Sequence, residues 1–132
     1  LELLAESFAI CRLGANDPVP AWALLPGAFA SICRSPDELS IVCPDPAVPR
    51  SVAAERGYRA LRVRGPLPFQ ITGVLAGIAR PLAEAEIPIF AISTYDTDYV
   101  LVRSRDLAQA VEVLREAGHV WPWATLDAPP LT

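Results

Sequence analysis

Residues 93–102 read Ser93-Thr94-Tyr95-Asp96-Thr97-Asp98-Tyr99-Val100-Leu101-Val102, and they join two β-rich runs through a polar turn. The first run, Ile89 to Thr94, is rich in apolar and β-branched residues, and the second begins at Tyr99. Runs of this kind on either side of a short polar segment predict two strands joined by a turn. Because rigid strands flank the two aspartates, their charge is held in a fixed place. We therefore expect the turn to be a receptor for a cationic or zwitterionic small molecule.

The segment from residue 58 onward predicts an alternation of strands and helices. Leu61 and Val63 alternate with arginines, which is typical of a half-buried strand. Gly65-Pro66-Leu67-Pro68 is a connector, and Thr72 is a suitable N-cap for a helix. The expected elements are strand 58–63, helix 72–85, strand 87–94, strand 98–103, helix 106–117 and strand 119–121.

Both helices show apolar residues at helical spacing, which predicts that one face of each lies in the core. These residues are Val74, Leu75, Ile78 and Leu82 in the first helix and Leu107, Ala110, Val111 and Leu114 in the second. Pro81 lies inside the first pattern, so we expect that helix to be kinked or shortened. Gly118 is placed to end the second helix as its C′ residue.

The first half of the chain repeats this order with a degraded first helix. A strand at 8–13 precedes a proline-rich segment, 14–27, with room for one helical turn near Trp22. Two runs around Ser35-Pro36-Asp37-Glu38 predict a β-hairpin. Ser51 is expected to cap a short helix that ends near Gly57. The strand at 59–64 then closes the first unit, begins the second, or is shared by both.

Strand, helix, strand, strand, helix, strand is the order of the ferredoxin-like fold, with both helices on one face of an antiparallel sheet. The sequence therefore predicts an α+β protein of two ferredoxin-like units, the first of them degenerate. We expect an N-terminal unit at 1–64, a C-terminal unit at 65–124 and a flexible tail at 125–132, where prolines cluster.

Composition excludes several functions. The 132 residues are 52% hydrophobic with a net charge of −4 and no basic block, so nucleic acid is not expected as a partner. No apolar run is long enough to span a bilayer, and no signal peptide pattern opens the chain, so we expect no membrane association and a cytoplasmic location.

The three cysteines are explained as buried free thiols. Neither a metal site nor a catalytic nucleophile is supported, and no cofactor is expected.

The start of the first helix and the turn offer opposite polarities. Free backbone N–H groups after Thr72 and Gly73 favour an anion, and a glycine lets a ligand approach the backbone. An ordinary helix cap explains the same residues equally well. Asp96 and Asp98 are able to accept an ammonium or guanidinium group, or to bind backbone N–H groups of their own turn. Arg59, Arg62 and Arg64 are typical of a solvated strand face.

Two stretches resemble ACT domains, namely Phe69-Gln70-Ile71-Thr72-Gly73-Val74-Leu75 and the run from Ile89 to Val102. They are similar to the bacterial tandem-ACT proteins related to the cytosolic arginine sensor CASTOR, as are Glu38 to Pro44 and Glu55 to Leu61. The resemblance covers about residues 8–118. It implies a regulatory fold that binds an amino acid where two domains meet. It also implies a set of ligand-binding residues, Thr72, Gly73, Val74, Thr94, Tyr95 and Asp98.

We therefore expect a non-catalytic protein that binds an amino acid-like ligand, such as arginine or another cationic amino acid, at a domain or subunit interface. A homodimer is expected, because the related sensor carries four ACT units and this chain has room for two. The signal would pass to a separate effector protein. The alternative is a scaffold that self-associates or docks a partner without any small molecule.

Overall fold

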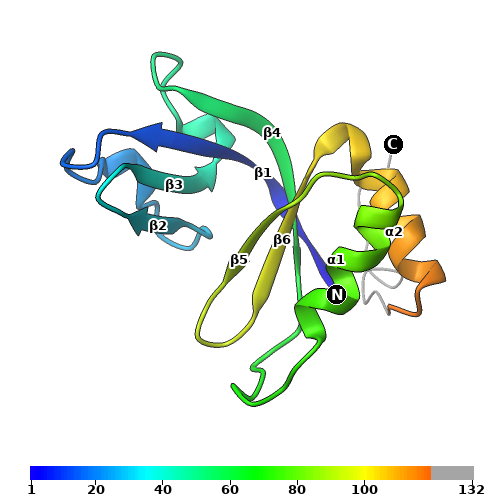
Figure 1. Cartoon of the computed structure of the whole chain (residues 1–132). Coiled ribbons are helices and arrows are strands. Elements are labelled where there is room, and N and C mark those ends of the chain that lie inside the picture. The colour runs from blue at the N-terminus through cyan, green and yellow to red at the C-terminus, as the bar shows by residue number, and fades with distance from the viewer. Residues whose placement is uncertain (120–132) are drawn as a thin grey trace. The chain divides into compact units, whose positions relative to one another are not determined.

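The computed structural model describes residues 1–119, which divide into two compact units. The N-terminal unit is Glu6–Tyr58, and the C-terminal unit combines Leu1–Ala5 with the residues from Arg59 onward. The strands are β1 (Glu2–Leu13), β2 (Ser31–Arg34), β3 (Leu39–Pro44), β4 (Ala54–Arg62), β5 (Phe90–Ser93) and β6 (Asp98–Arg103). The helices are α1 (Val74–Glu84) and α2 (Leu107–Glu116), and single 3₁₀ turns occupy Ala21–Ala23, Asp45–Ala47 and Ser104–Asp106 (Figure 1). No helix in the described residues is long and apolar enough to cross a membrane.

Hydrogen bonds connect the strands in the order β2-β3-β1-β4-β6-β5. The pairs β1/β3, β2/β3 and β5/β6 are antiparallel, with register pairs such as Cys11 opposite Ile41 and Ser93 opposite Asp98. β1 and β4 each run through both units, so the first residues of β1 and the last of β4 belong to the C-terminal unit. The strand expected near 59–64 corresponds to the end of β4, whose residues from Arg59 to Arg62 belong to the C-terminal unit. The sequence-based division instead cuts the chain between residues 64 and 65.

The N-terminal unit contains the expected hairpin. β2 and β3 are joined at Ser35, whose hydroxyl accepts the backbone N–H groups of Asp37 and Glu38 at 3.2 Å each. The expected helical turn near Trp22 is also present, at Ala21–Ala23. The core holds Cys11 and Cys43, whereas Cys33 is exposed, so the prediction of three buried thiols is wrong for Cys33. Burial raises the pKa of Cys43 to about 11, so this thiol stays protonated at neutral pH.

The short helix expected after Ser51 is wrong, because β4 already begins at Ala54. The first residues of β4 are held in extended form by the loop that precedes this strand. The Asp45 carboxylate accepts hydrogen bonds from Arg56 and from the backbone N–H of Gly57, both at 2.8 Å. Arg56 also donates to the carbonyl oxygens of Val48 and Pro49. Together these long-range hydrogen bonds stabilise the strand by more than one serine cap would stabilise a helix of four or five residues.

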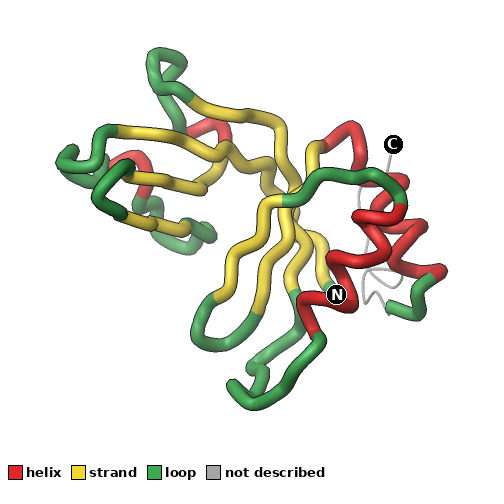
Figure 2. The backbone as a smooth tube through the Cα atoms, in the orientation of Figure 1, coloured by secondary structure: helices red, strands yellow, loops and turns green. Residues whose placement is uncertain are grey.

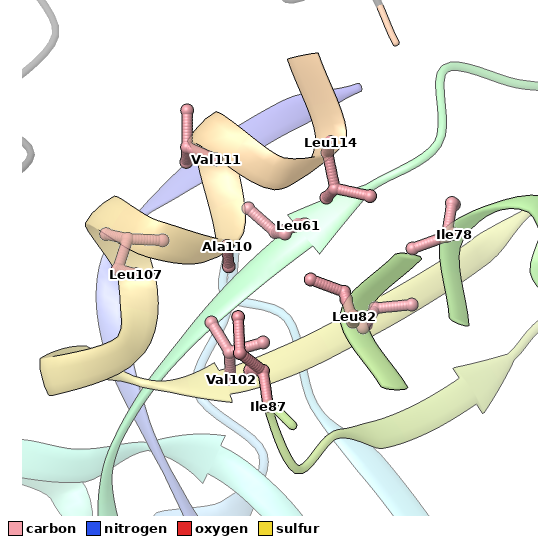
Figure 3. Close-up of a cluster of buried hydrophobic side chains, with 10 residues drawn as sticks. Leu61, Ile78, Leu82, Ile87, Val102, Leu107, Ala110, Val111 and Leu114 are labelled. Carbon is pink, nitrogen blue, oxygen red and sulfur yellow. The ribbon is translucent and has the colours of Figure 1, made fainter. Parts of the chain in front are cut away.

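The helices of the C-terminal unit pack on one face of the sheet, as expected. Side chains from α1, α2, β4 and β6 meet in a single buried cluster (Figure 3). All four residues predicted for the apolar stripe of the second helix are buried, and β6 has the expected bounds. The cluster consists of Leu61, Ile78, Leu82, Ile87, Val100, Val102, Leu107, Ala110, Val111 and Leu114. β1 is longer than expected and β5 is shorter, and the strand expected at 119–121 and the tail at 125–132 extend outside the described residues.

Helix α1 begins one residue later than a Thr72 cap would place it. The N-cap residue is Gly73, with φ at +82° and no side-chain hydrogen bond, so the prediction of Thr72 as the cap is wrong. An L-residue is strained at this φ and glycine is not, which is why the chain turns into the helix at Gly73. Pro81 does not shorten α1, because the helix continues to Glu84.

The missing N–H of Pro81 is compensated from α2. Proline removes the hydrogen bond that residue 81 would donate to the Gly77 carbonyl, and His119 Nε2 lies 2.9 Å from that oxygen. His119 reaches it because α2 ends in a Schellman motif, with Gly118 at φ +95°. In that motif the Gly118 N–H bonds to Arg115 and the His119 N–H to Leu114. The Nε2–H tautomer therefore ties the end of α2 to the middle of α1.

We predict that His119→Ala lowers the free energy of unfolding by about 0.5–1.5 kcal/mol, the usual contribution of one hydrogen bond. The loss should be smaller in a Pro81→Ala background, because an alanine at that position supplies a backbone N–H of its own to the Gly77 carbonyl. Chemical denaturation of the two single variants and the double variant measures this coupling. Equal losses in both backgrounds would show that His119 does not compensate for the proline.

Candidate functional site

A groove of about 290 Å³ lies in the C-terminal unit between the segment that leads into α1 and the β5–β6 turn. Figure 2 shows both segments as loops that leave the strands of this unit. The segment 67–76 contributes Leu67, Pro68, Phe69, Ile71, Gly73, Val74, Leu75 and Ala76, and the turn contributes Ser93, Thr94, Tyr95, Asp96, Thr97 and Asp98.

The turn is a tight four-residue reversal. The Thr94 N–H donates to the Thr97 carbonyl at 2.8 Å, and the Thr97 N–H donates to the Thr94 hydroxyl at 3.2 Å. Tyr95 and Asp96 are left at its tip, exposed to solvent. The turn therefore presents one aromatic ring and one carboxylate from an ordered backbone.

Three contacts hold the turn against the connector that follows β4. The hydroxyl of Thr97, a residue only 8% exposed, donates to the Val63 carbonyl at 2.6 Å. The Leu67 N–H donates to the Asp96 carbonyl at 2.7 Å. The same carbonyl approaches Gly65 so closely that a Cβ there would lie 2.9 Å from the oxygen. The two walls of the groove are thus fixed to each other by the Thr97 hydroxyl and by backbone contacts.

The start of α1 supplies hydrogen-bond donors to the groove. The first bond of the helix runs from the Gly77 N–H to the Gly73 carbonyl at 2.9 Å. The N–H groups of Val74, Leu75 and Ala76 therefore precede the helical hydrogen-bond ladder, and these three residues line the groove. Together with the helix dipole they favour an anionic group at this end.

The opposite wall supplies acceptors. The half-buried Asp98 receives a hydrogen bond on Oδ1 from the Ser93 hydroxyl at 2.6 Å, which orients the carboxylate. Asp96 adds a second carboxylate, and no Lys, Arg or His is among the described residues that line the groove. The wall formed by the turn therefore brings two carboxylates to a groove that has no cation among its described lining residues.

Two aromatic rings meet at the groove. The centroids of Phe69 and Tyr95 are 4.7 Å apart and the ring planes are inclined by 62°. Phe69 is 71% exposed and Tyr95 is 80% exposed. Each ring comes from a different wall, so their contact bridges the groove.

Five of the six residues predicted to bind a ligand line this groove, namely Gly73, Val74, Thr94, Tyr95 and Asp98. Thr72 does not line it and is exposed. Sequence reasoning missed the roles of Phe69 and Ser93. Ser93 pairs with Asp98 directly across the β5–β6 ladder, a relation that the predicted hairpin already contained. Phe69 lies 26 positions before Tyr95, and no local pattern relates the two.

A second, more polar cavity of about 300 Å³ shares Thr94, Asp96 and Thr97 with the groove. It contains an ion-pair cluster in which Glu2 binds Arg62, and Arg64 Nε lies 3.2 Å from Glu2 Oε1. The hydrogen bond from Arg62 is the largest influence that lowers the pKa of Glu2, and Arg64 adds to it. Within residues 1–119, no three or more His, Cys, Asp or Glu side chains form a group able to hold a metal ion.

Comparison with known proteins supports an α+β fold of the ACT type. A family model described as an ACT domain matches residues 53–116, and a second model, described as an N-terminal domain, matches residues 6–51. The cytosolic arginine sensor for mTORC1 subunit 1 of Homo sapiens is 41% identical over 59 residues, which are 44% of this chain and 18% of the sensor. The chain thus spans only 18% of the length of this curated relative.

Two solved structures extend the likeness over most of the chain. Protein Atu0741 from Agobacterium tumefaciens is 41% identical with a TM-score of 0.85, and the match covers 91% of this chain and 89% of that one. The aspartate kinase of Clostridium acetobutylicum is 14% identical with a TM-score of 0.61, over 86% of this chain and 33% of the kinase, and this likeness concerns the fold alone.

In the C-terminal unit, two helices pack on an antiparallel sheet, and the family model of the ACT domain matches this part of the chain. Fold and family model together define a protein of the regulatory ACT type. The chain belongs to the ACT-domain proteins, in the group related to the CASTOR arginine sensor, which confirms the resemblance found in the sequence.

Gly65 and Gly77 provide a matched test of the connection between the two walls. We predict that Gly65→Ala destabilises the protein by about 1–3 kcal/mol, because the new Cβ must displace the Asp96 carbonyl. Gly77→Ala should instead stabilise it by about 0.5–1 kcal/mol, because Gly77 lies inside α1 with open space around the new Cβ. Unfolding in denaturant measures both effects, and wild-type stability in Gly65→Ala would contradict the close packing.

The Glu2 cluster predicts a dependence of stability on pH. Because the pKa of Glu2 is lower in the folded protein than its ordinary value of 4.5, the cluster stabilises the fold above that value. This contribution is lost as the pH falls through the folded pKa. The stability of wild type should therefore decrease more between about pH 5 and about pH 3 than that of Glu2→Gln. Glu6→Gln, at an exposed position on the same strand, is the control, and parallel pH profiles for wild type and Glu2→Gln would refute the prediction.

Proposed function

We propose that this protein is a non-catalytic regulatory protein that binds an amino acid with a cationic side chain, such as arginine, in the groove between residues 67–76 and 93–98. The observation that carries the proposal is the presence of the α1 start and of Asp98 in one cavity. A zwitterion with a cationic side chain requires donors at one end and acceptors at the other. A volume of about 290 Å³ lies near the lower end of ligand pockets, which begin at about 300 Å³, and suits a ligand of amino acid size.

The α-carboxylate of the ligand is assigned to the start of α1. Backbone N–H groups among Gly73, Val74, Leu75 and Ala76, which precede the hydrogen-bond ladder of α1 and line the groove, would bind it. The absence of a side chain at Gly73 leaves the backbone open to approach, since nothing lies within 4 Å of the position a Cβ would take. Donors at the N-terminus of a helix form a common anion site in proteins.

The cationic group is assigned to Asp98. Ser93 donates to Oδ1, and Oδ2 would accept from a guanidinium or ammonium group. Thr94 and Tyr95 would form the wall beside it, and Asp96 would add negative charge. The description of the human relative as an arginine sensor supports this class of ligand.

We further propose that the protein acts as a cytoplasmic homodimer in which a second copy covers the open side of the groove. Phe69, Ile71 and Tyr95 line the groove and are exposed, which suits burial against another surface. A ligand held between copies would stabilise one arrangement of them, and this shift would be the signal to a separate effector protein.

The N-terminal unit is proposed to be a degenerate ACT unit. Its order, β1, 3₁₀ turn, β2, β3, 3₁₀ turn, β4, parallels the order β4, α1, β5, β6, α2 of the C-terminal unit. The proline-rich segment 14–27 would stand where a first helix was lost.

A scaffold without a small-molecule ligand is the alternative function, and the exposed rings of Phe69 and Tyr95 favour it as well. The two functions differ in one property that is simple to measure. A ligand-binding protein responds to free amino acids, and a scaffold does not.

The test is calorimetric titration of the full chain with L-arginine, L-lysine and L-citrulline, the last being a neutral analogue of arginine. We expect binding of the cationic amino acids and not of citrulline. Asp98→Asn should weaken arginine binding about tenfold to a hundredfold, because a hydrogen bond to a charged group contributes about 1.5–3 kcal/mol. The variant keeps an acceptor for Ser93, so its fold should be retained.

Asp37→Asn is the matched control, because Asp37 is likewise an aspartate beside a hairpin turn but lies in the N-terminal unit and does not line the groove. It should bind arginine as wild type does. Unchanged binding in Asp98→Asn would remove the assigned role of Asp98. No binding of any amino acid by wild type at millimolar concentration would favour the scaffold.

A further inference from the structure

The turns of the β2–β3 and β5–β6 hairpins share one hydrogen-bond pattern. In the C-terminal unit the Thr94 N–H donates to the Thr97 carbonyl, and the Thr94 hydroxyl accepts the Thr97 N–H. In the N-terminal unit the Ser35 N–H donates to the Glu38 carbonyl at 2.9 Å, and the Ser35 hydroxyl accepts the Glu38 N–H. The four residues of one turn therefore correspond one to one with the four residues of the other.

The residues that flank the two turns also correspond, but they differ in chemistry. Ser93 pairs with Asp98 across the β5–β6 ladder, and Arg34 pairs with Leu39 across the β2–β3 ladder. Arg34 thus occupies the position that corresponds to Ser93, and the buried Leu39 occupies the one that corresponds to Asp98. The N-terminal unit has a guanidinium and an apolar side chain where the C-terminal unit has a hydroxyl and a carboxylate.

The segment beside each turn corresponds as well. Leu13, at the end of β1, matches Val63, because each lies next to the residue that begins the last strand of its hairpin. Residues 14–17 therefore match residues 64–67, which lead into the groove. In the N-terminal unit the chain beyond this point forms a 3₁₀ turn and no α-helix before β2, so it offers no α-helix start with free N–H groups.

The side chain of Arg34 connects the turn to this segment. Its Nη1 donates to the Ala15 carbonyl, and its Nη2 donates to the Asp17 carbonyl at 2.8 Å. The segment is itself a closed turn, because the Asp17 N–H binds the Gly14 carbonyl and the Asp17 carboxylate accepts the Gly14 N–H at 2.8 Å. Two ordered carbonyl groups therefore converge on one guanidinium.

The polarity of this place is the reverse of that of the groove. In the groove the start of α1 offers donors and the turn offers carboxylates, whereas here the segment offers acceptors and the hairpin supplies the cation. A planar guanidinium presents two donors in fixed directions and so matches two neighbouring carbonyls, which a single ammonium group does less well. Because this cation belongs to the chain, its effective concentration at the carbonyls exceeds that of a free amino acid.

We propose that the N-terminal unit contains a guanidinium site of its own, which the side chain of Arg34 keeps filled. The inference goes beyond the proposed function and does not depend on it, because Arg34 and its acceptors lie outside the groove. A free guanidinium compound reaches these carbonyls only when Arg34 leaves them. The competing explanation is a surface arginine whose removal changes nothing in the segment.

The test is chemical complementation of Arg34→Ala in the full chain, followed by NMR. Loss of the guanidinium should loosen residues 14–17, so the amides of Gly14 and Asp17 should exchange roughly three- to tenfold faster, as expected for the loss of exposed charged hydrogen bonds. Ethylguanidinium chloride should then move the resonances of both amides toward their wild-type positions. Ethylammonium chloride at the same concentration should not.

Two further variants control for charge and for the removal of any arginine. Arg34→Lys keeps the charge but loses the planar pair of donors, so the amides of Gly14 and Asp17 should exchange faster than in wild type. Arg50→Ala removes an exposed arginine elsewhere in the N-terminal unit and should leave both amides unchanged.

Two results would overturn the proposal. Wild-type exchange in Arg34→Ala would show that Arg34 does not hold the segment. Equal resonance shifts with the two added cations, or no shift with either, would show that these carbonyls form no guanidinium site. A parallel titration with L-arginine keeps the two proposals apart: if wild type shows no response at the groove, the proposed function fails and the result for Arg34 stands.

Discussion

The hydrogen bond from the Thr97 hydroxyl to the Val63 carbonyl, 2.6 Å long, is the contact on which the site depends. A buried hydroxyl without a partner is costly, so this threonine fixes where the β5–β6 turn lies relative to the connector after β4. Gly65 then admits the Asp96 carbonyl, and Leu67 binds it. The position of the turn is consequently set by the Thr97 hydroxyl together with main-chain contacts, and the other side chains of the groove are not needed to hold it.

The proposed recognition of a ligand in this groove rests on the separation of polarities. A helix start supplies donors whose partial positive charge is fixed by the backbone, and the opposite turn supplies carboxylates with no cation among the described lining residues. Neither half is specific alone, because helix starts and acidic turns are common at protein surfaces. Their presence in one cavity, with ordered aromatic rings beside them, distinguishes this site from an ordinary cap and an ordinary turn.

The elements best predicted from sequence are those with strong internal periodicity. The stripe Leu107, Ala110, Val111 and Leu114 was sufficient to place α2. The start of α1 was misplaced because Thr72 and Gly73 are both acceptable caps, and only the backbone angle at Gly73 distinguishes them. The short helix at Ser51 was wrong because Asp45 and Arg56, eleven positions apart, hold β4 extended. The roles of Phe69 and His119 each depend on a partner more than twenty residues away, Tyr95 and Gly77, and local patterns carry no information about such pairs.

The division of β1 and β4 between the two units limits where the chain can be cut into fragments. Leu1–Ala5 belong to the C-terminal unit, together with the residues from Arg59 onward, while the rest of β1 belongs to the N-terminal unit. A cut after Tyr58 would leave Leu1–Ala5 on the N-terminal fragment and remove them from the unit to which they belong. A fragment that begins at Arg59 would therefore lack a strand segment of its own sheet, so that removal of the N-terminal residues also damages the C-terminal unit.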